Sequence, residues 1–131
     1  MAGSWGALVY RKGYLNGAYV PLHGLEKEFT ADAADGSIPV ETVDDVSGWL
    51  CGVDIVSGVD FEVPETGFDA LSLAVQTRDG VEIIATTAAL TASGRLLVEP
   101  PMPFADGLKL VPTGNTTVNA KGKIIPLVSP A

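Results

Sequence analysis

Neighbouring carboxylates are the residues of this chain that come nearest to a catalytic pattern. Asp44 and Asp45 are adjacent, with Glu41 before them and Asp54 in the apolar run that follows. Two carboxylates can hydrolyse a glycosidic bond when their surroundings separate their pKa values, so that one donates a proton while the other stays ionised. Nothing in the spacing pairs these residues across a cleft, and a solvated acidic surface is the simpler interpretation. We therefore expect no enzyme, and keep a hydrolase that depends on Asp44 and Asp45 only as a third hypothesis.

Calcium binding would use the same class of side chain, because calcium prefers oxygen ligands. The available aspartates are Asp32, Asp35, Asp44, Asp45 and Asp60. They do not form the Asp-x-Asp-x-Asp-Gly loop of a calcium site, and the segment 32–36 reads as a turn. We predict no metal and no other cofactor.

The chain contains one histidine, His23, and one cysteine, Cys51. These numbers exclude a disulfide framework within one chain and a zinc site of the usual Cys/His type, and they disfavour a Ser-His or Cys-His nucleophile. His23 is expected to be a packed or surface residue. Cys51 is expected to be a small buried hydrophobe, because the charges near it are acidic and would not favour a thiolate.

The charge balance limits the classes of partner. The 131 residues include 16 acidic and 8 basic side chains, for a net charge of −8, and we predict no nucleic-acid partner because such proteins present a basic surface. No stretch reaches the ~18 apolar residues needed to span a membrane, and the N-terminus lacks the pattern of a secretory signal. We therefore expect synthesis in the cytosol and no membrane contact. The glycosylation sequence Asn115-Thr116-Thr117 is then expected to be unused.

Aromatic residues are concentrated near the N-terminus, where Trp5, Tyr10, Tyr14 and Tyr19 occur in a glycine-rich segment. Such side chains are favoured at protein interfaces because they combine a large apolar surface with a polar group. Either the body of the protein folds over them or another chain does. We predict that these four residues form an assembly interface.

Residues 1–36 are expected to form an N-terminal arm that consists of a hairpin and a linker. Asn16-Gly17 is typical of a two-residue hairpin turn, and residues 25–29 could form one helical turn. The alternative is a strand and loop that pack on the main body. If the segment is a docking arm, removal of residues 1–35 should abolish attachment while the body stays folded.

From residue 37 onward, short apolar runs alternate with turn residues at the spacing of a sandwich or barrel. The expected strands are Ile38–Val43, Trp49–Val56, Ala70–Thr77, Val81–Ala88, Arg95–Val98, Leu108–Val111, Thr116–Asn119 and Ile124–Val128. This pattern predicts an all-β fold, an antiparallel β-sandwich or jelly roll over residues 37–131, with the N-terminal arm extending from it.

The clearest expected element is a hairpin around Asp79-Gly80. Asp-Gly suits a type I′ turn, which would place Val75 opposite Ile84. Leu71, Leu73 and Val75 are spaced by two and should share one buried face.

Two segments contain prolines that a central strand would not tolerate. Residues 100–104 are expected to form an extended crossover between sheets, with Phe104 in the core. The last strand is expected to have Pro126 at an edge or a bulge.

Three segments together resemble small structural proteins of tailed bacteriophages. They are the strand 50–58 (LCGVDIVSG), the Asp79-Gly80 hairpin, and the segment 103–110 (PFADGLKL). The resemblance covers about residues 48–128 and departs at the end, where Ile124–Val128 replaces the aromatic closing strand of such proteins. It implies a multimeric, non-catalytic β-sandwich displayed on the virion, and it carries over no site residue.

The first functional hypothesis is therefore a virion structural protein. It would be a capsid decoration protein or a head or tail accessory protein, located in the virion after assembly in the host cytoplasm. Its partners would be major capsid or tail proteins and further copies of itself, as a trimer or a larger ring. The alternative is a carbohydrate-binding β-sandwich module in which Trp49, Phe61 and Phe68 contact the sugar.

Overall fold

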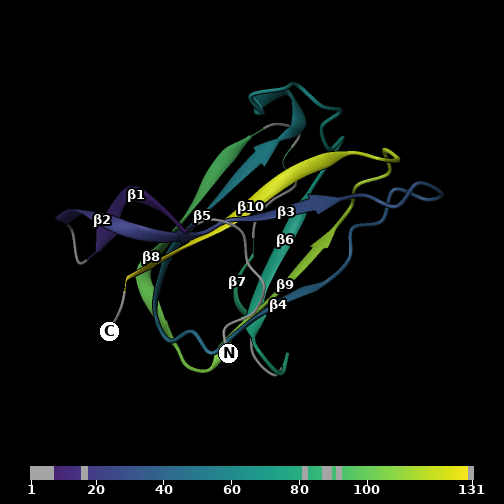
Figure 1. Ribbon diagram of the computed structural model, residues 1–131. Helices are drawn as coiled ribbons and strands as arrows, with labels where there is room; N and C mark the ends of the chain where they lie inside the picture. Colours follow the sequence, from purple (N-terminus) through teal and green to yellow (C-terminus); the bar gives the residue numbers. More distant parts are fainter. Residues whose placement is uncertain (1–7, 16–17, 81–82, 87–89, 91–92, 130–131) are drawn as a thin grey trace.

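Two layers of antiparallel β-sheet make up the computed structural model, which describes residues 8–15, 18–80, 83–86, 90 and 93–129 (Figure 1). The strands are β1 (Leu8–Leu15), β2 (Ala18–Leu25), β3 (Lys27–Thr30), β4 (Glu41–Asp44), β5 (Gly48–Ser57), β6 (Ser72–Thr77), β7 (Ile83–Thr86), β8 (Gly94–Phe104), β9 (Gly107–Thr113) and β10 (Lys121–Ser129), with a 3₁₀ turn, η1, at Gly58–Asp60. One sheet has the order β1-β2-β10-β5-β8, with β3 also paired to β10, and the other has the order β4-β9-β6-β7. The expected all-β sandwich is confirmed. In the described part of the chain, no helix has the length and apolar character needed to cross a membrane.

The main core lies between the two sheets. Leu71, Leu73 and Val75 are buried on one face of the β6 segment, as their spacing predicted, and Val53 and Ile124 are among the residues opposite them in the same cluster. Every second residue of these strands points inward, so a period of two in apolar residues is sufficient to build the layer.

A second, smaller cluster is buried on the other face of the larger sheet. Leu22, Cys51, Ile125 and Leu127 form it, and all are at most 1 % exposed. Cys51 is the extra residue of a bulge in β5, because the register with both neighbouring strands shifts there. β1 comes close to β5 and β10 although it hydrogen-bonds to neither. The β1–β2 hairpin therefore crosses this face of the sheet.

The predicted N-terminal hairpin is present. Leu15 pairs with Ala18, which leaves residues 16–17 as a two-residue connection, and the ladder continues to Leu8 and Leu25. Residues 16–17 themselves lie outside the described part of the chain. In Figure 1 the hairpin reaches to the left past the body of the sandwich.

The helical turn expected at residues 25–29 is wrong, because Lys27–Thr30 form strand β3 against β10. Only Phe29 is buried in this strand, while Glu28 and Thr30 are exposed. Phe29 and Ala31 belong to the main core. Removal of residues 1–35 would therefore take core side chains from the body, and the boundary at residue 36 stays a prediction.

The β6–β7 hairpin differs from the prediction in its turn. The Gly80 amide donates to the Thr77 carbonyl at 2.8 Å, and Gly80 has φ of 79° while Asp79 does not have a positive φ. A type I′ turn needs two residues with positive φ, so that turn type was wrong. A bulge between Val75 and Gln76 then shifts the register, and Val75 pairs with Ala85 rather than Ile84.

Two proline-rich segments are also placed differently. The crossover expected at residues 100–104 is instead part of β8, an edge strand whose prolines lie where the pairing with β5 is interrupted or at its end. Phe104 is buried in the core, as predicted. Pro126 lies in a central strand, β10, where it pairs with Val53 of β5 on one side and lies opposite the break between β2 and β3 on the other.

The strand expected at Thr116–Asn119 is wrong. These residues form a loop that ends in a turn with Asn119 at a φ of 57°. Two side-chain hydrogen bonds hold this loop instead of a strand ladder: Asp69 Oδ1 accepts the Thr116 amide, and Asn115 Nδ2 donates to the Thr117 carbonyl.

Candidate functional site

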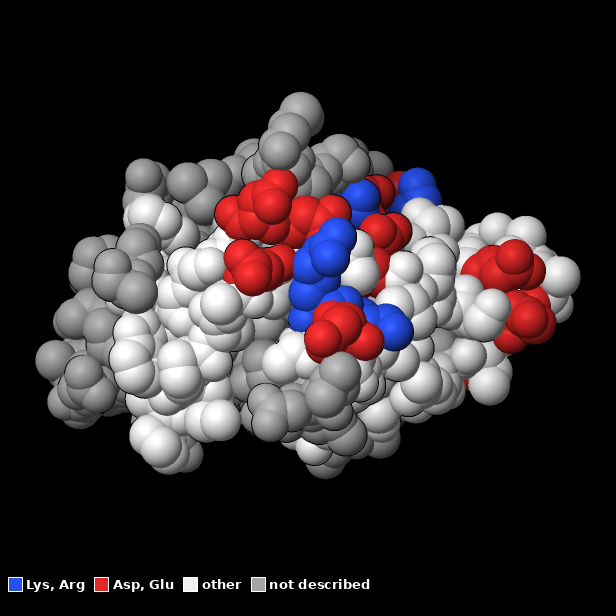
Figure 2. Space-filling model, turned by 90° about the horizontal axis from the view of Figure 1, so that it is seen from below, with Lys and Arg blue, Asp and Glu red and all other residues white. Residues whose placement is uncertain are grey.

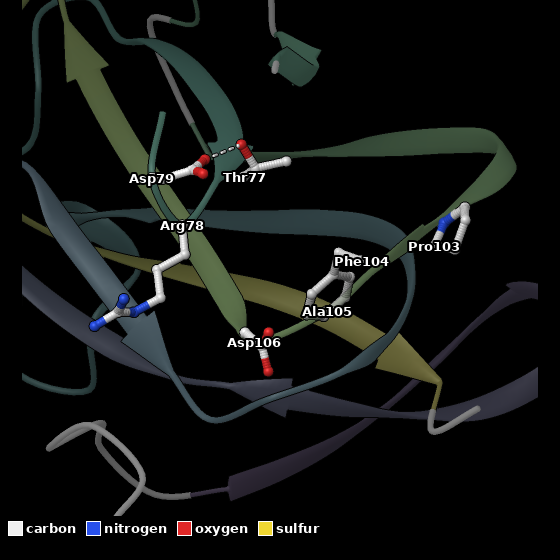
Figure 3. Close-up of a pocket in the computed structure, with 7 residues that line it drawn as sticks. All are labelled: Thr77, Arg78, Asp79, Pro103, Phe104, Ala105 and Asp106. Atoms are coloured by element: carbon white, nitrogen blue, oxygen red, sulfur yellow. Dashed lines mark hydrogen bonds between the residues drawn. The ribbon is translucent and has the colours of Figure 1, made fainter. Parts of the chain in front are cut away.

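An open hollow of about 540 Å³ lies at the lower end of the sandwich, between two turns. One turn follows β6 and the other joins β8 to β9 (Figure 3). The lining residues are Thr77, Arg78, Asp79, Pro103, Phe104, Ala105 and Asp106. The hollow therefore brings together two segments that are distant in the sequence.

Arg78 is the basic residue of this hollow, and its charge is compensated by carboxylates. Its Nε donates to Asp44 Oδ1, and the two side chains are 54 % and 34 % exposed. The hydrogen bond and charge of Asp44, with smaller effects from Asp45 and Asp106, raise the pKa of the Arg78 guanidinium. Figure 3 shows the guanidinium directed away from Pro103, Phe104 and Ala105. Arg78 is thus a surface ion-pair partner rather than a group aimed into the hollow.

Backbone geometry fixes the turn on the other side of the hollow. Asp106 has φ of 63°, its amide donates to Ser47 Oγ at 3.1 Å, and Gly107 follows with φ of 114°. A side chain at Gly107 would overlap the carbonyl oxygen of Val43. Only glycine fits at this close approach.

The candidate catalytic pair Asp44 and Asp45 lies beside this hollow, at the end of β4. Asp44 is engaged by Arg78, and Asp45 is exposed at a φ of 60°. Figure 2 shows acidic side chains gathered around a short basic stripe on the side of the molecule that is lowest in Figure 1. The residues that line the hollow include no histidine, cysteine or serine, and the Thr77 hydroxyl donates to Asp79 at 2.9 Å. The arrangement is that of a solvated, charge-compensated surface.

The aspartates considered for calcium are dispersed. Asp32 Oδ1 accepts the Ala34 amide at 2.7 Å, and Asp35 Oδ1 accepts both the amide and the hydroxyl of Ser37. These bonds lower the pKa of Asp35, the backbone hydrogen bond of Ser37 being the largest cause. Over the described ranges, no three His, Cys, Asp or Glu side chains gather closely enough to hold a metal ion.

The three aromatic residues considered for sugar binding are not brought together. Phe68 is buried in the core at 6 % exposure. Trp49 is 40 % exposed near the start of β5, whereas Phe61 follows the end of that strand and lies under the Lys123 ammonium, 5.2 Å from the ring centroid. A strand of ten residues is roughly 30 Å long, so these two rings cannot form one platform.

Three of the four residues predicted for assembly lie in the β1–β2 hairpin. Tyr14 pairs with Tyr19, and Tyr10 pairs with His23. Directly paired residues share a face of the ladder, so this register puts the three tyrosine positions on one face. Trp5 lies outside the described residues.

Two residues for which no functional role was predicted, Cys51 and Asn115, have structural roles. Cys51 is 1 % exposed, and burial raises the pKa of its thiol, in agreement with the expected buried hydrophobe. The Asn115 side chain, 7 % exposed, donates from Nδ2 to the carbonyls of Gly36 and Thr117. An amide engaged in this way is not available as a glycan acceptor in the folded protein.

Sequence reasoning missed two polar contacts. Arg95 pairs with Asp54 through two hydrogen bonds on the outer face of the larger sheet, one of them 2.9 Å long. Asp69 accepts the amide and hydroxyl of Thr116. Asp54 is the one charged residue of the otherwise apolar run 50–56. This isolated charge was the signal in the sequence for a partner on the neighbouring strand.

The chain matches no protein-family model, no curated protein and no solved structure.

Proposed function

We propose that this protein is a non-catalytic structural component of a tailed-phage virion, a capsid decoration protein or a head or tail accessory protein. It assembles through its N-terminal hairpin with copies of itself and with major capsid or tail proteins. The resemblance of residues 48–128 to such proteins supports the class, and the all-β architecture is compatible with it.

The observation that carries the proposal is the way in which the β1–β2 hairpin is attached. β1 and β2 pair along eight residues each, whereas β2 pairs with β10 only at Gly24 and His23. Leu22 of β2 is also buried in the smaller cluster, but toward its turn the described part of the hairpin pairs only with itself, and a two-stranded ribbon by itself is marginally stable in water. Contact with a second chain would stabilise it.

The edge strands differ in how well they are protected against pairing with another chain. β8 contains three prolines, and β4 and β7 are four residues long. β1 is an edge strand of eight residues without proline. Long edges without proline are the ones that add to other sheets, which favours β1 as the assembly edge.

The test is the molar mass of the full chain in solution, measured by size exclusion with light scattering over a range of concentrations. The wild type is expected to form a trimer or a larger ring, and Tyr14→Ser with Tyr19→Ser is expected to remain monomeric. A matched control replaces two exposed valines outside the hairpin, Val40→Ser with Val118→Ser, which are 48 % and 42 % exposed. This control should assemble as the wild type does.

A monomeric wild type at high concentration would contradict the self-assembly in this proposal, and equal masses for wild type and tyrosine variant would contradict the role of the hairpin. The carbohydrate-binding alternative has less support, because Phe68 is buried and Trp49 lies far from Phe61.

A further inference from the structure

The loop that follows β5, residues 58–67, presents the most exposed large apolar side chains among the described residues. Val59 is 68 % exposed and Val63 is 71 % exposed. We refer to residues 58–67 as the valine loop. Exposed apolar groups on a surface loop lower solubility unless they meet a partner, so the loop is a candidate contact surface.

The valine loop is held in one conformation by its own backbone and by the neighbouring strands. The amides of Phe61 and Glu65 both donate to the Gly58 carbonyl, at 3.2 and 2.9 Å, and the Thr66 carbonyl accepts the Lys121 amide at 2.8 Å. Asp60 accepts the Ser93 hydroxyl. The two valines are therefore displayed on a preorganised surface, which lowers the entropy lost on binding.

The charges of the valine loop define the partner that it would accept. The loop contains Asp60, Glu62 and Glu65 and no basic residue. The Lys123 ammonium that lies over Phe61 is paired with Glu26 at 3.1 Å, so it leaves the negative charge of the loop in place. In the sequence, Val59 directly precedes Asp60, and Val63 directly follows Glu62. A complementary surface must combine apolar or aromatic groups with positive charge.

The β1–β2 hairpin is the segment of this chain with that chemistry. Residues 8–25 contain Arg11 and Lys12 and no acidic residue, a charge of +2, so the remaining residues carry −8 − 2 = −10. The same segment contains Tyr10, Tyr14 and Tyr19. In Figure 1 the valine loop lies at the top of the molecule and the hairpin extends at the left.

We propose that the valine loop docks the β1–β2 hairpin of a second copy of this chain. The inference rests on the proposed function and specifies the contact between two copies of the chain. Because hairpin and loop are different surfaces, the contact is head-to-tail, and it generates a ring if the rotation closes.

The test is charge reversal and rescue, read out as the dissociation constant of self-association by sedimentation at fixed ionic strength. Glu62→Lys with Glu65→Lys should weaken association by about tenfold or more, and Arg11→Glu with Lys12→Glu should weaken it similarly. The combination of all four substitutions restores opposite charges and should recover affinity to within about threefold of wild type. Urea denaturation of each variant checks that it is folded.

The matched control reverses two carboxylates elsewhere, Glu28→Lys with Glu41→Lys, and should leave association unchanged. If Glu62→Lys with Glu65→Lys associates like the wild type, the inference is wrong. It is also wrong if the variant with all four substitutions associates no more tightly than the two double variants. If either result is obtained while Tyr14→Ser with Tyr19→Ser is monomeric, docking on the valine loop is refuted but assembly through the hairpin is not. If the wild type is monomeric, or if the tyrosine variant still associates, the proposed assembly falls and the inference falls with it.

Discussion

The side-chain amide of Asn115 donates a hydrogen bond to the backbone carbonyl of Gly36, 2.7 Å away and 79 positions earlier in the chain. Asn115 Oδ1 also accepts the Asp69 amide at 3.0 Å. One buried side chain thus joins three loops at the same end of the sandwich. A buried polar group of this kind stabilises the fold only when its partners are present.

Replacing Asn115 should therefore be costly. Asn115→Ala leaves the Gly36 and Thr117 carbonyls and the Asp69 amide without their partner, and we expect a loss of about 2–4 kcal/mol in the free energy of unfolding. Urea denaturation measures this loss. Val118→Ala, in the same loop but exposed, should change stability by less than about 0.5 kcal/mol. Equal effects of the two substitutions would refute the role of Asn115.

Asp69 should make the stability depend on acid pH. Its pKa is lowered below the ordinary value of 3.8, first by the hydrogen bond from the Thr116 hydroxyl and then by that from the Thr116 amide. A carboxyl with a lowered folded-state pKa stabilises the fold above its unfolded pKa, and this stabilisation is lost as the pH falls through the folded pKa. Wild type should therefore lose more stability than Asp69→Asn between pH 5 and pH 2. Parallel curves of urea midpoint against pH would contradict this assignment.

Two strand glycines should respond in opposite ways to alanine. A Cβ at Gly122 would overlap the Phe68 ring and lie 2.8 Å from the Val56 carbonyl oxygen, whereas at Gly94 it would have no neighbour within 4 Å. We expect Gly122→Ala to destabilise the protein by about 1–3 kcal/mol or more because the core is overpacked. Gly94→Ala should leave the melting temperature unchanged or raise it slightly. A Gly122→Ala variant as stable as wild type would show that Phe68 does not pack there.

Cys51 should be inert in the folded protein. It is fully buried, and burial raises the pKa of its thiol, so both access and the thiolate fraction are low. Reaction with a thiol reagent at neutral pH should be negligible in buffer and complete in denaturant. Rapid modification in buffer would mean that the cluster formed with Leu22, Ile125 and Leu127 opens readily.

The strands with a strict period of two could be predicted from the sequence, but the turn type and register of the β6–β7 hairpin could not. β6 was found because Leu71, Leu73 and Val75 alternate with less buried residues. The bulge after Val75 depends on how the ladder accommodates the turn at Gly80, which no local pattern encodes. The proline-containing segment 100–104 was predicted as a crossover rather than as part of β8 for a related reason. An edge strand tolerates them, and edge position is a property of the whole sheet.

The candidate site was predicted in part. Asp44 was identified as a notable carboxylate, but its partner Arg78 is 34 positions away. The two residues meet because β4 and β6 lie on either side of β9, an arrangement that follows from sheet order rather than from sequence spacing. Nothing in the sequence singled out Val59 and Val63, since their exposure depends on how the ends of the valine loop are fixed.

Amide hydrogen exchange of the full chain, compared at low and high protein concentration, tests the role of the hairpin most directly. We expect amides of β1 to exchange more slowly at the concentration where the assembly forms, while those of β6, which is paired on both sides, do not change. Equal exchange of β1 at both concentrations, with slowing confined to other strands, would contradict assembly through the hairpin.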